Sequence, residues 1–96
     1  MAERPTQGVL IGAGPAIPDV AEFNRRFVIA QRGVTFQVGS WDKRFTGEMV
    51  AWINSGKAPS EEQQLHVYRI AHRYRRQISD QAVVDYAASR IGEAES

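Results

Sequence analysis

A row of basic and histidine side chains lies on one stretch of this chain, from Ser60 to Ile78. At about 100° per residue, most of them share one side of a helix. With neighbouring cations included, the set is Lys57, His66, Arg69, His72, Arg73, Arg75 and Arg76. Such a basic face can contact nucleic-acid phosphates without reading base sequence. It can also meet a protein partner, or serve as an ordinary solvated surface.

Two other side chains of the same stretch, Leu65 and Tyr68, form a second apolar lane beside His72. They fall outside the main apolar stripe of the helix. The residues of that stripe are Val67, Ile70, Ala71, Tyr74 and Ile78. Two interpretations of the second lane stay open. Either a neighbouring helix covers it, or it is an exposed patch that receives a partner.

Residues for catalysis or metal binding are scarce. The chain has no cysteine, which excludes disulfides and thiolate zinc sites. His66 and His72 are too far apart on one helix for the usual metal-binding pair, which is spaced by three or four residues. Ser40, Asp42 and a histidine could be drawn as a triad, but no local motif supports it. The sequence therefore predicts a protein that is not an enzyme and holds no metal.

The run Val9–Ala16 resembles the glycine fingerprint of a Rossmann dinucleotide-binding unit. It departs from that pattern at the positions that would bind the pyrophosphate and the ribose. Ile17 replaces the third glycine, and Pro18 delays the following helix, so its first amides cannot hold a pyrophosphate at the glycine turn. No acidic residue follows near Gln37 to grip a ribose hydroxyl. We therefore predict a glycine-rich turn and no nucleotide cofactor.

Two capping boxes mark the starts of helices. Ser60 and Gln63 can satisfy each other's free backbone amides, and Asp19 and Glu22 make the same pattern after Pro18. Together with the spacing of apolar residues, these signals predict four helices. Their ranges are Asp19–Gly33, Phe45–Ile53, Ser60–Ile78 and Asp80–Gly92, with Ser79 as an alternative cap of the last helix.

Two short strands complete the predicted fold, at Val9–Ile11 and at Val34–Val38. The segment Phe27–Val38 also has an alternative interpretation, as a β-hairpin with a glycine-containing loop. We predict an α+β fold, mostly helical, in which two paired or adjacent strands are covered by a C-terminal three-helix unit. The predicted core consists of Phe23, Phe27, Phe36, Trp52, Ile70 and Tyr74.

The second and third predicted helices, joined by a short turn, have the spacing of a helix-turn-helix. In that motif the start of the second helix meets the base edges. Here that start carries Glu61 and Glu62, which are unfavourable against a phosphate-lined groove. The pattern therefore argues against sequence-specific reading of duplex DNA.

Length and charge limit the remaining possibilities. The 96 residues suit one domain, 1–96, and we expect its ends, 1–7 and 93–96, to be flexible. The net charge is only +1, so any nucleic-acid binding depends on where the charges lie. The apolar run Val9–Ile17 is too short to cross a membrane. The sequence predicts a cytoplasmic protein that does not bind membranes.

One resemblance covers about the C-terminal half. The run Trp41–Phe45, the cap formed by Ser60 and Gln63, and the pairs Arg69–Ile70 and Tyr74–Arg75 resemble a segment of small proteins from phages and other mobile elements. Such proteins often bind host or defence machinery, and anti-CRISPR inhibitors are among them. The resemblance implies a partner in a host or defence protein complex. It carries over no catalytic residue. A nucleic-acid-binding module that uses the basic face on phosphates is the alternative.

Overall fold

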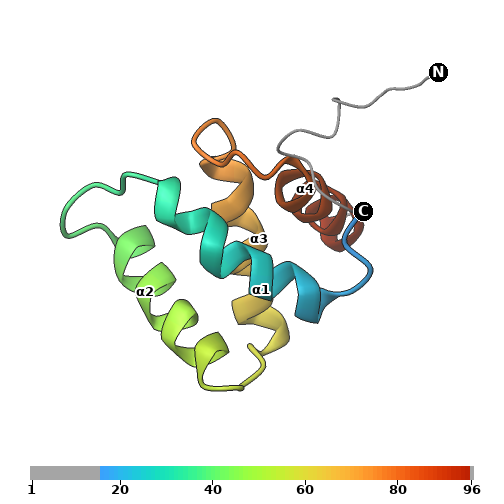
Figure 1. The fold of residues 1–96 in the computed structure, drawn as a ribbon, viewed down its shortest axis with the longest axis horizontal. Helices are drawn as coiled ribbons and strands as arrows, with labels where there is room; N and C mark the ends of the chain where they lie inside the picture. The colour runs from blue at the N-terminus through green and yellow to red at the C-terminus, as the bar shows by residue number, and fades with distance from the viewer. Residues whose placement is uncertain (1–15, 96) are drawn as a thin grey trace.

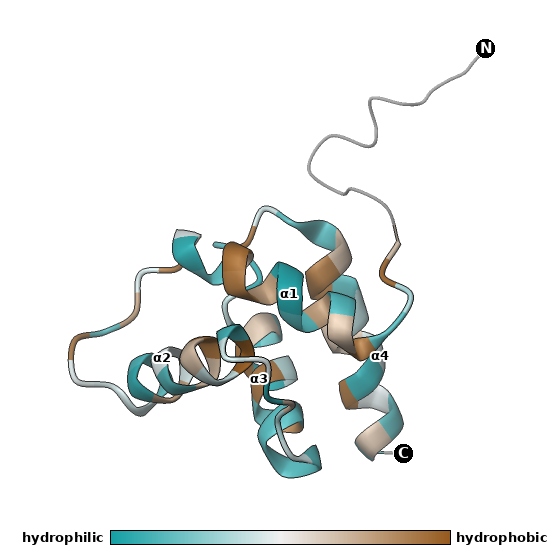
Figure 2. Ribbon diagram, turned by 60° about the horizontal axis from the view of Figure 1, so that its bottom comes forward, coloured by the Kyte–Doolittle hydropathy of each residue, from teal (hydrophilic) through white to brown (hydrophobic). Residues whose placement is uncertain are grey.

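The computed structural model describes residues 16–95, and this part of the chain is helical with no strand. The α-helices are α1 (Val20–Ala30), α2 (Trp41–Asn54), α3 (Glu61–Arg73) and α4 (Gln81–Glu95), and the 3₁₀ turn η2 (Gln31–Gly33) extends α1. Helix α3 lies between α2 and α4, and α1 lies across them (Figures 1 and 2). The most extensive helix pairing is between α3 and α4.

The predicted α+β class is therefore wrong. Val34–Val38 forms a loop, and the hairpin alternative is also wrong because α1 occupies its first strand and η2 its loop. Strand propensity needs a neighbouring strand to take the backbone hydrogen bonds, and none lies beside this loop among residues 16–95. Instead the Thr35 amide donates to the side-chain oxygen of Gln77 at 2.8 Å. The other predicted strand, Val9–Ile11, lies outside the described residues.

Side-chain caps explain where the helices begin. Asp19 accepts from the Glu22 amide at 2.9 Å at the start of α1. The capping box of Ser60 and Gln63 is formed in both directions at the start of α3. Both starts lie where they were predicted, but the capping box at Asp19 forms in one direction only, and the Glu22 carboxylate accepts from Arg25. Helix α2 begins four residues earlier than predicted, because the Ser40 hydroxyl caps it by accepting from the Lys43 amide.

The helix ends differ more from the prediction. Helix α3 stops at Arg73 instead of Ile78, and a turn follows in which the Gln77 amide donates to the Tyr74 carbonyl at 2.9 Å. The turn returns the chain so that Ile78 is buried in the core. Helix α4 continues past Gly92, the predicted end, to Glu95. Glu93–Glu95, which we expected to be flexible, are thus helical, and residues 1–7 are not described.

Phe23, on α1, is fully buried at the centre of the core. Its ring lies edge-on to Tyr68 of α3 with centroids 5.0 Å apart, and it stacks on Tyr86 of α4 at 5.3 Å. Phe27 and Ile70 are also buried, as predicted. These contacts join α1, α3 and α4.

Three other predicted core residues lie nearer the surface. Phe36 and Tyr74 are partly buried, with their ring centroids 4.9 Å apart at the edge of the core. Trp52 is 39% exposed, so its assignment to the core is wrong. Its indole N–H donates to the Ala58 carbonyl at 3.1 Å, and Lys57 lies over its ring. The indole therefore packs on the turn after α2 instead of on α3.

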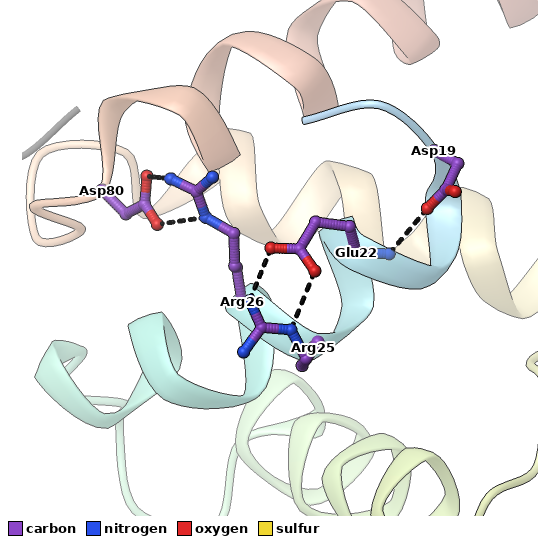
Figure 3. Close-up of polar contacts among 5 residues, drawn as sticks. All are labelled: Asp19, Glu22, Arg25, Arg26 and Asp80. Atoms are coloured by element: carbon purple, nitrogen blue, oxygen red, sulfur yellow. Dashed lines mark hydrogen bonds and ion pairs between the residues drawn. The ribbon is translucent and has the colours of Figure 1, made fainter. Parts of the chain in front are cut away.

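Two polar contacts fix α1 against its neighbours. Arg26 donates two hydrogen bonds to Asp80, at 2.9 and 2.7 Å, and this pair ties α1 to the start of α4 (Figure 3). Asn24 and Gln64 exchange a reciprocal pair of amide hydrogen bonds, at 2.9 and 2.8 Å, between α1 and α3. Both pairs satisfy polar groups that the packing of α1 removes from water.

Candidate binding surface

The apolar lane of α3 is largely covered. Tyr68 is only 8% exposed, because α1 and α4 place Phe23 and Tyr86 against its ring. Leu65 is half-buried and packs at the edge of the core. Of the two interpretations left open, coverage by neighbouring helices is correct for Tyr68. Tyr68 is therefore not an exposed anchor for a large partner.

The basic face of α3 is also less free than its sequence indicates. The guanidinium of Arg73 lies 2.6 Å from the Asp42 carboxylate on α2, and that of Arg69 lies 3.5 Å from Glu95 on α4. Arg75 donates to the His72 carbonyl within its own turn at 2.9 Å. Arg69 and Arg73, which the sequence placed on one basic face, are thus paired with carboxylates on opposite sides of α3. Arg76, which follows α3, is exposed.

Asp42 accepts hydrogen bonds from both Arg73, at 2.6 Å, and the Tyr74 hydroxyl, at 2.7 Å. Burial of Asp42 acts to raise its pKa, but the hydrogen bonds from Arg73 and Tyr74 outweigh burial. The result is a pKa below the usual value of 3.8. We call Asp42, Arg73 and Tyr74 together the Asp42 node, and this node joins the start of α2 to the end of α3.

The Asp42 node should contribute stability that depends on pH. Because the pKa of Asp42 is lowered by folding, its stabilisation is complete above the unfolded value near 4 and is lost as pH falls through the lower folded pKa. Asp42→Asn should lower the free energy of unfolding by about 1–2 kcal/mol at pH 7, since Arg73 is half-exposed and screened. Urea unfolding at pH 7 and pH 2.5 tests this. A difference that persists unchanged at pH 2.5 would contradict the ionic origin.

His66 faces α2 instead of the arginines. Its ring lies edge-on to Trp41 and to Phe45, with centroid distances of 5.5 and 5.8 Å. Trp41 stacks on Phe45 at 4.8 Å and remains 49% exposed. One face of Trp41 is therefore held in place by aromatic contacts while much of the indole still reaches solvent.

Trp41 and Trp52 lie on the same flank of α2. They are about three helical turns apart, which corresponds to about 16 Å along the helix. At the second indole, the Lys57 ammonium lies 4.4 Å from the ring centroid of Trp52. Gly56, with φ of 88°, makes the turn that brings Lys57 back to this position.

Trp41 contacts His66 of α3, and Trp52 packs on the turn that joins α2 to α3. We call this surface the tryptophan seam, and its residues are Trp41, Glu48, Trp52, Lys57, Gln63 and His66. Beside Trp52 it has a hollow of about 500 Å³, which Glu48, Met49, Lys57 and Gln63 also line. A surface with rigid aromatic side chains and mixed charges has the chemistry of a protein-docking site.

Sequence reasoning identified Lys57 and His66 but assigned Trp52 to the core and gave Trp41 no place in a binding surface. A signal was present, since Trp41 and Trp52 recur on one helical flank, and Asp42, Lys43 and Arg44 directly follow the first of them. The predicted residues Leu65, Tyr68, Arg69 and Arg75 lie elsewhere on or after α3. The seam is therefore a smaller and more aromatic surface than the predicted basic face.

Other residues that the sequence singled out have structural roles. Ser40 uses its hydroxyl as a helix cap, and Asp42 is paired with Arg73, so neither is placed as part of a triad. Within residues 16–95 no group of three or more acidic or histidine side chains could hold a metal ion. In the same range no helix is long and apolar enough to cross a bilayer. The glycine fingerprint lies almost entirely outside the described range.

Comparisons of the chain with protein-family models, curated proteins and solved structures gave no match.

Proposed function

We propose that this protein is a non-enzymatic binding module that docks a protein partner on the tryptophan seam. The partial exposure of Trp41 on a stacked aromatic base carries the proposal. Tryptophan is enriched among the residues that dominate protein interfaces, and a side chain already fixed by packing loses little entropy on binding. Trp52 offers a second anchor three turns away, with Lys57 beside it for a carboxylate of the partner.

The charges near the seam favour a protein over nucleic acid. Asp42 neutralises Arg73, and Glu48 lies between the two tryptophans near Lys57. Phosphate binding depends on unpaired cations that release counterions from the nucleic acid. A surface in which cations and carboxylates alternate lacks this driving force, but it suits the mixed rim of a protein interface.

We further propose that the partner belongs to a host or defence protein complex, which the protein blocks by occupying a surface of it. This part rests on the resemblance of the C-terminal half to small phage and mobile-element proteins. The residues that carry the resemblance include Trp41, which stands at one end of the seam, and Gln63, which lines its hollow.

The test is a pull-down from host lysate with the full chain as bait, with and without nuclease. We expect a protein partner that is retained after nuclease treatment. Trp41→Ala should weaken its binding at least about tenfold, as expected for an interface anchor. Ile29→Ala is the matched control, because Ile29 is a large hydrophobic residue that is 53% exposed on α1, away from the seam.

Recovery of nucleic acid alone would contradict the proposal. In that case loss of binding should follow Arg75→Ala and Arg76→Ala, with Trp41→Ala having little effect. Circular dichroism of each variant would show that the helices are intact. Equal loss with Trp41→Ala and Ile29→Ala would also count against a seam-specific interface.

A further inference from the structure

A second hollow lies between the first turns of α3 and the last turns of α4. Helix α4 lies on the other side of α3 from α2 (Figure 1). The hollow has a volume of about 630 Å³ and is broadly open to solvent. Tyr68 is the buried residue of its lining, Leu65 beside it is partly buried, and Glu61, Glu62 and Glu93 are exposed at its edge. An apolar floor is thus bordered by carboxylates from two helices. We call it the α3–α4 groove.

The charge of this groove favours a cation. Arg90, the one basic residue in its lining, donates to Glu93 at 2.8 Å and to the Tyr86 hydroxyl at 3.1 Å, so its charge is already engaged. Glu61 and Glu62 form no ion pair within residues 16–95. Their place in the first turn of α3 stabilises them as anions. The last turn of α4, on the opposite wall, adds the partial negative charge of a helix C-terminus.

Tyr68 provides an independent sign of a ligand. Its side chain is more than nine-tenths buried, yet its hydroxyl makes no hydrogen bond within the described residues. The Tyr68 oxygen is not fully enclosed, because within residues 16–95 the one fully enclosed side-chain polar atom without a partner belongs to Thr46. Since Tyr68 lines the groove, its hydroxyl remains in contact with the groove. Burial raises the pKa of Tyr68 to about 12, which keeps the phenol protonated and neutral. A neutral phenol oxygen can accept a hydrogen bond from an ammonium group.

We propose that the α3–α4 groove binds a linear alkyl polyamine. The methylene chain of such a ligand would lie on Leu65, and its ammonium groups would meet the carboxylates of Glu61 and Glu62. One ammonium would also donate to the Tyr68 hydroxyl. This ligand matches the site because it alternates charge and apolar surface over a short length, as the lining does.

A basic peptide fits the groove less well. Its backbone would bring N–H and C=O groups that need partners when they leave water. Gln64 is the one amide side chain in the lining, and both its oxygen and its nitrogen are engaged with Asn24. A bare divalent cation fits poorly as well, because the floor of the groove is apolar.

Calorimetric titration of the full chain with spermidine at low ionic strength tests the proposal. We expect one saturable site whose affinity falls as salt is added. The double variant Glu61→Gln, Glu62→Gln should lose affinity about tenfold or more, and Tyr68→Phe about threefold. Tyr68→Phe keeps the buried ring, so its melting temperature should stay close to that of the wild type.

Glu48→Gln is the matched control, since Glu48 is an exposed carboxylate on α2 outside the groove. Its affinity for spermidine should equal that of the wild type. Absence of saturable binding, or equal losses with Glu48→Gln and the double variant, would overturn the proposal. A lysine-containing peptide or Mg²⁺ that binds more tightly than spermidine would overturn the ligand assignment. None of these outcomes depends on the tryptophan seam.

Discussion

Replacing Phe23 by alanine is expected to lower the free energy of unfolding by about 3–5 kcal/mol, the largest effect of any single substitution considered. Phe23 is fully buried, and its ring contacts Phe27, Tyr68 and Tyr86. These rings come from three helices, so the cavity cannot collapse without moving a whole helix. Urea unfolding followed by circular dichroism at pH 7 measures the loss directly.

Phe36→Ala is the matched comparison for Phe23→Ala. Phe36 lies in the loop before α2, is partly buried, and contacts Tyr74 through one edge-on ring pair. Its removal should cost about 1–2 kcal/mol, because neighbouring loop residues and water can fill the space. A larger loss for Phe36 than for Phe23 would place the centre of the core near the loop instead of between α1, α3 and α4.

The helices were predictable because their signals are local. The caps Asp19 and Ser60 use hydrogen bonds within one turn, and they mark the starts of α1 and α3 in the structure. The loop Val34–Val38 was not predictable in this way. Its residues favour a strand only when another strand lies alongside. Here the partner of Thr35 is the side chain of Gln77, more than forty positions away.

Spacing along one helix did not predict which side chains are exposed, because exposure also depends on contacts with neighbouring elements. Trp52 had the helical position of a core residue, but Ala58 and Lys57 hold its indole at the surface. Tyr68 had the position of a surface residue, but α1 and α4 cover it. Periodicity gives the face of a helix, while the neighbouring elements decide whether that face is covered.

Contacts between helices also explain why the basic face was predicted incompletely. Arg69 and Arg73 were correctly placed on α3, but their carboxylate partners lie on α4 and α2. Pairing between helices cannot be read from a run of cations in the sequence. Because Arg69 and Arg73 are paired, we place the candidate binding surface on the aromatic side chains of α2 and keep a protein partner as the proposal.

Replacing Ile70 by alanine is expected to lower the free energy of unfolding by about 2–4 kcal/mol. Ile70 is buried on α3, which packs against α2 on one side and α4 on the other. For a domain of this size, the loss should lower the melting temperature by roughly 10–25 °C. Thermal unfolding monitored by circular dichroism is the measurement.

Ile29→Ala removes the same atoms from a surface position on α1, where Ile29 is 53% exposed. Its effect should stay within about 0.5 kcal/mol, since little apolar surface is lost and alanine favours the helix. The contrast between the two variants isolates burial from helix propensity, because both exchange isoleucine for alanine in a helix. Equal melting temperatures for Ile70→Ala and Ile29→Ala would mean that α3 is not the central helix, and the packing of α2 and α4 on it would have to be abandoned.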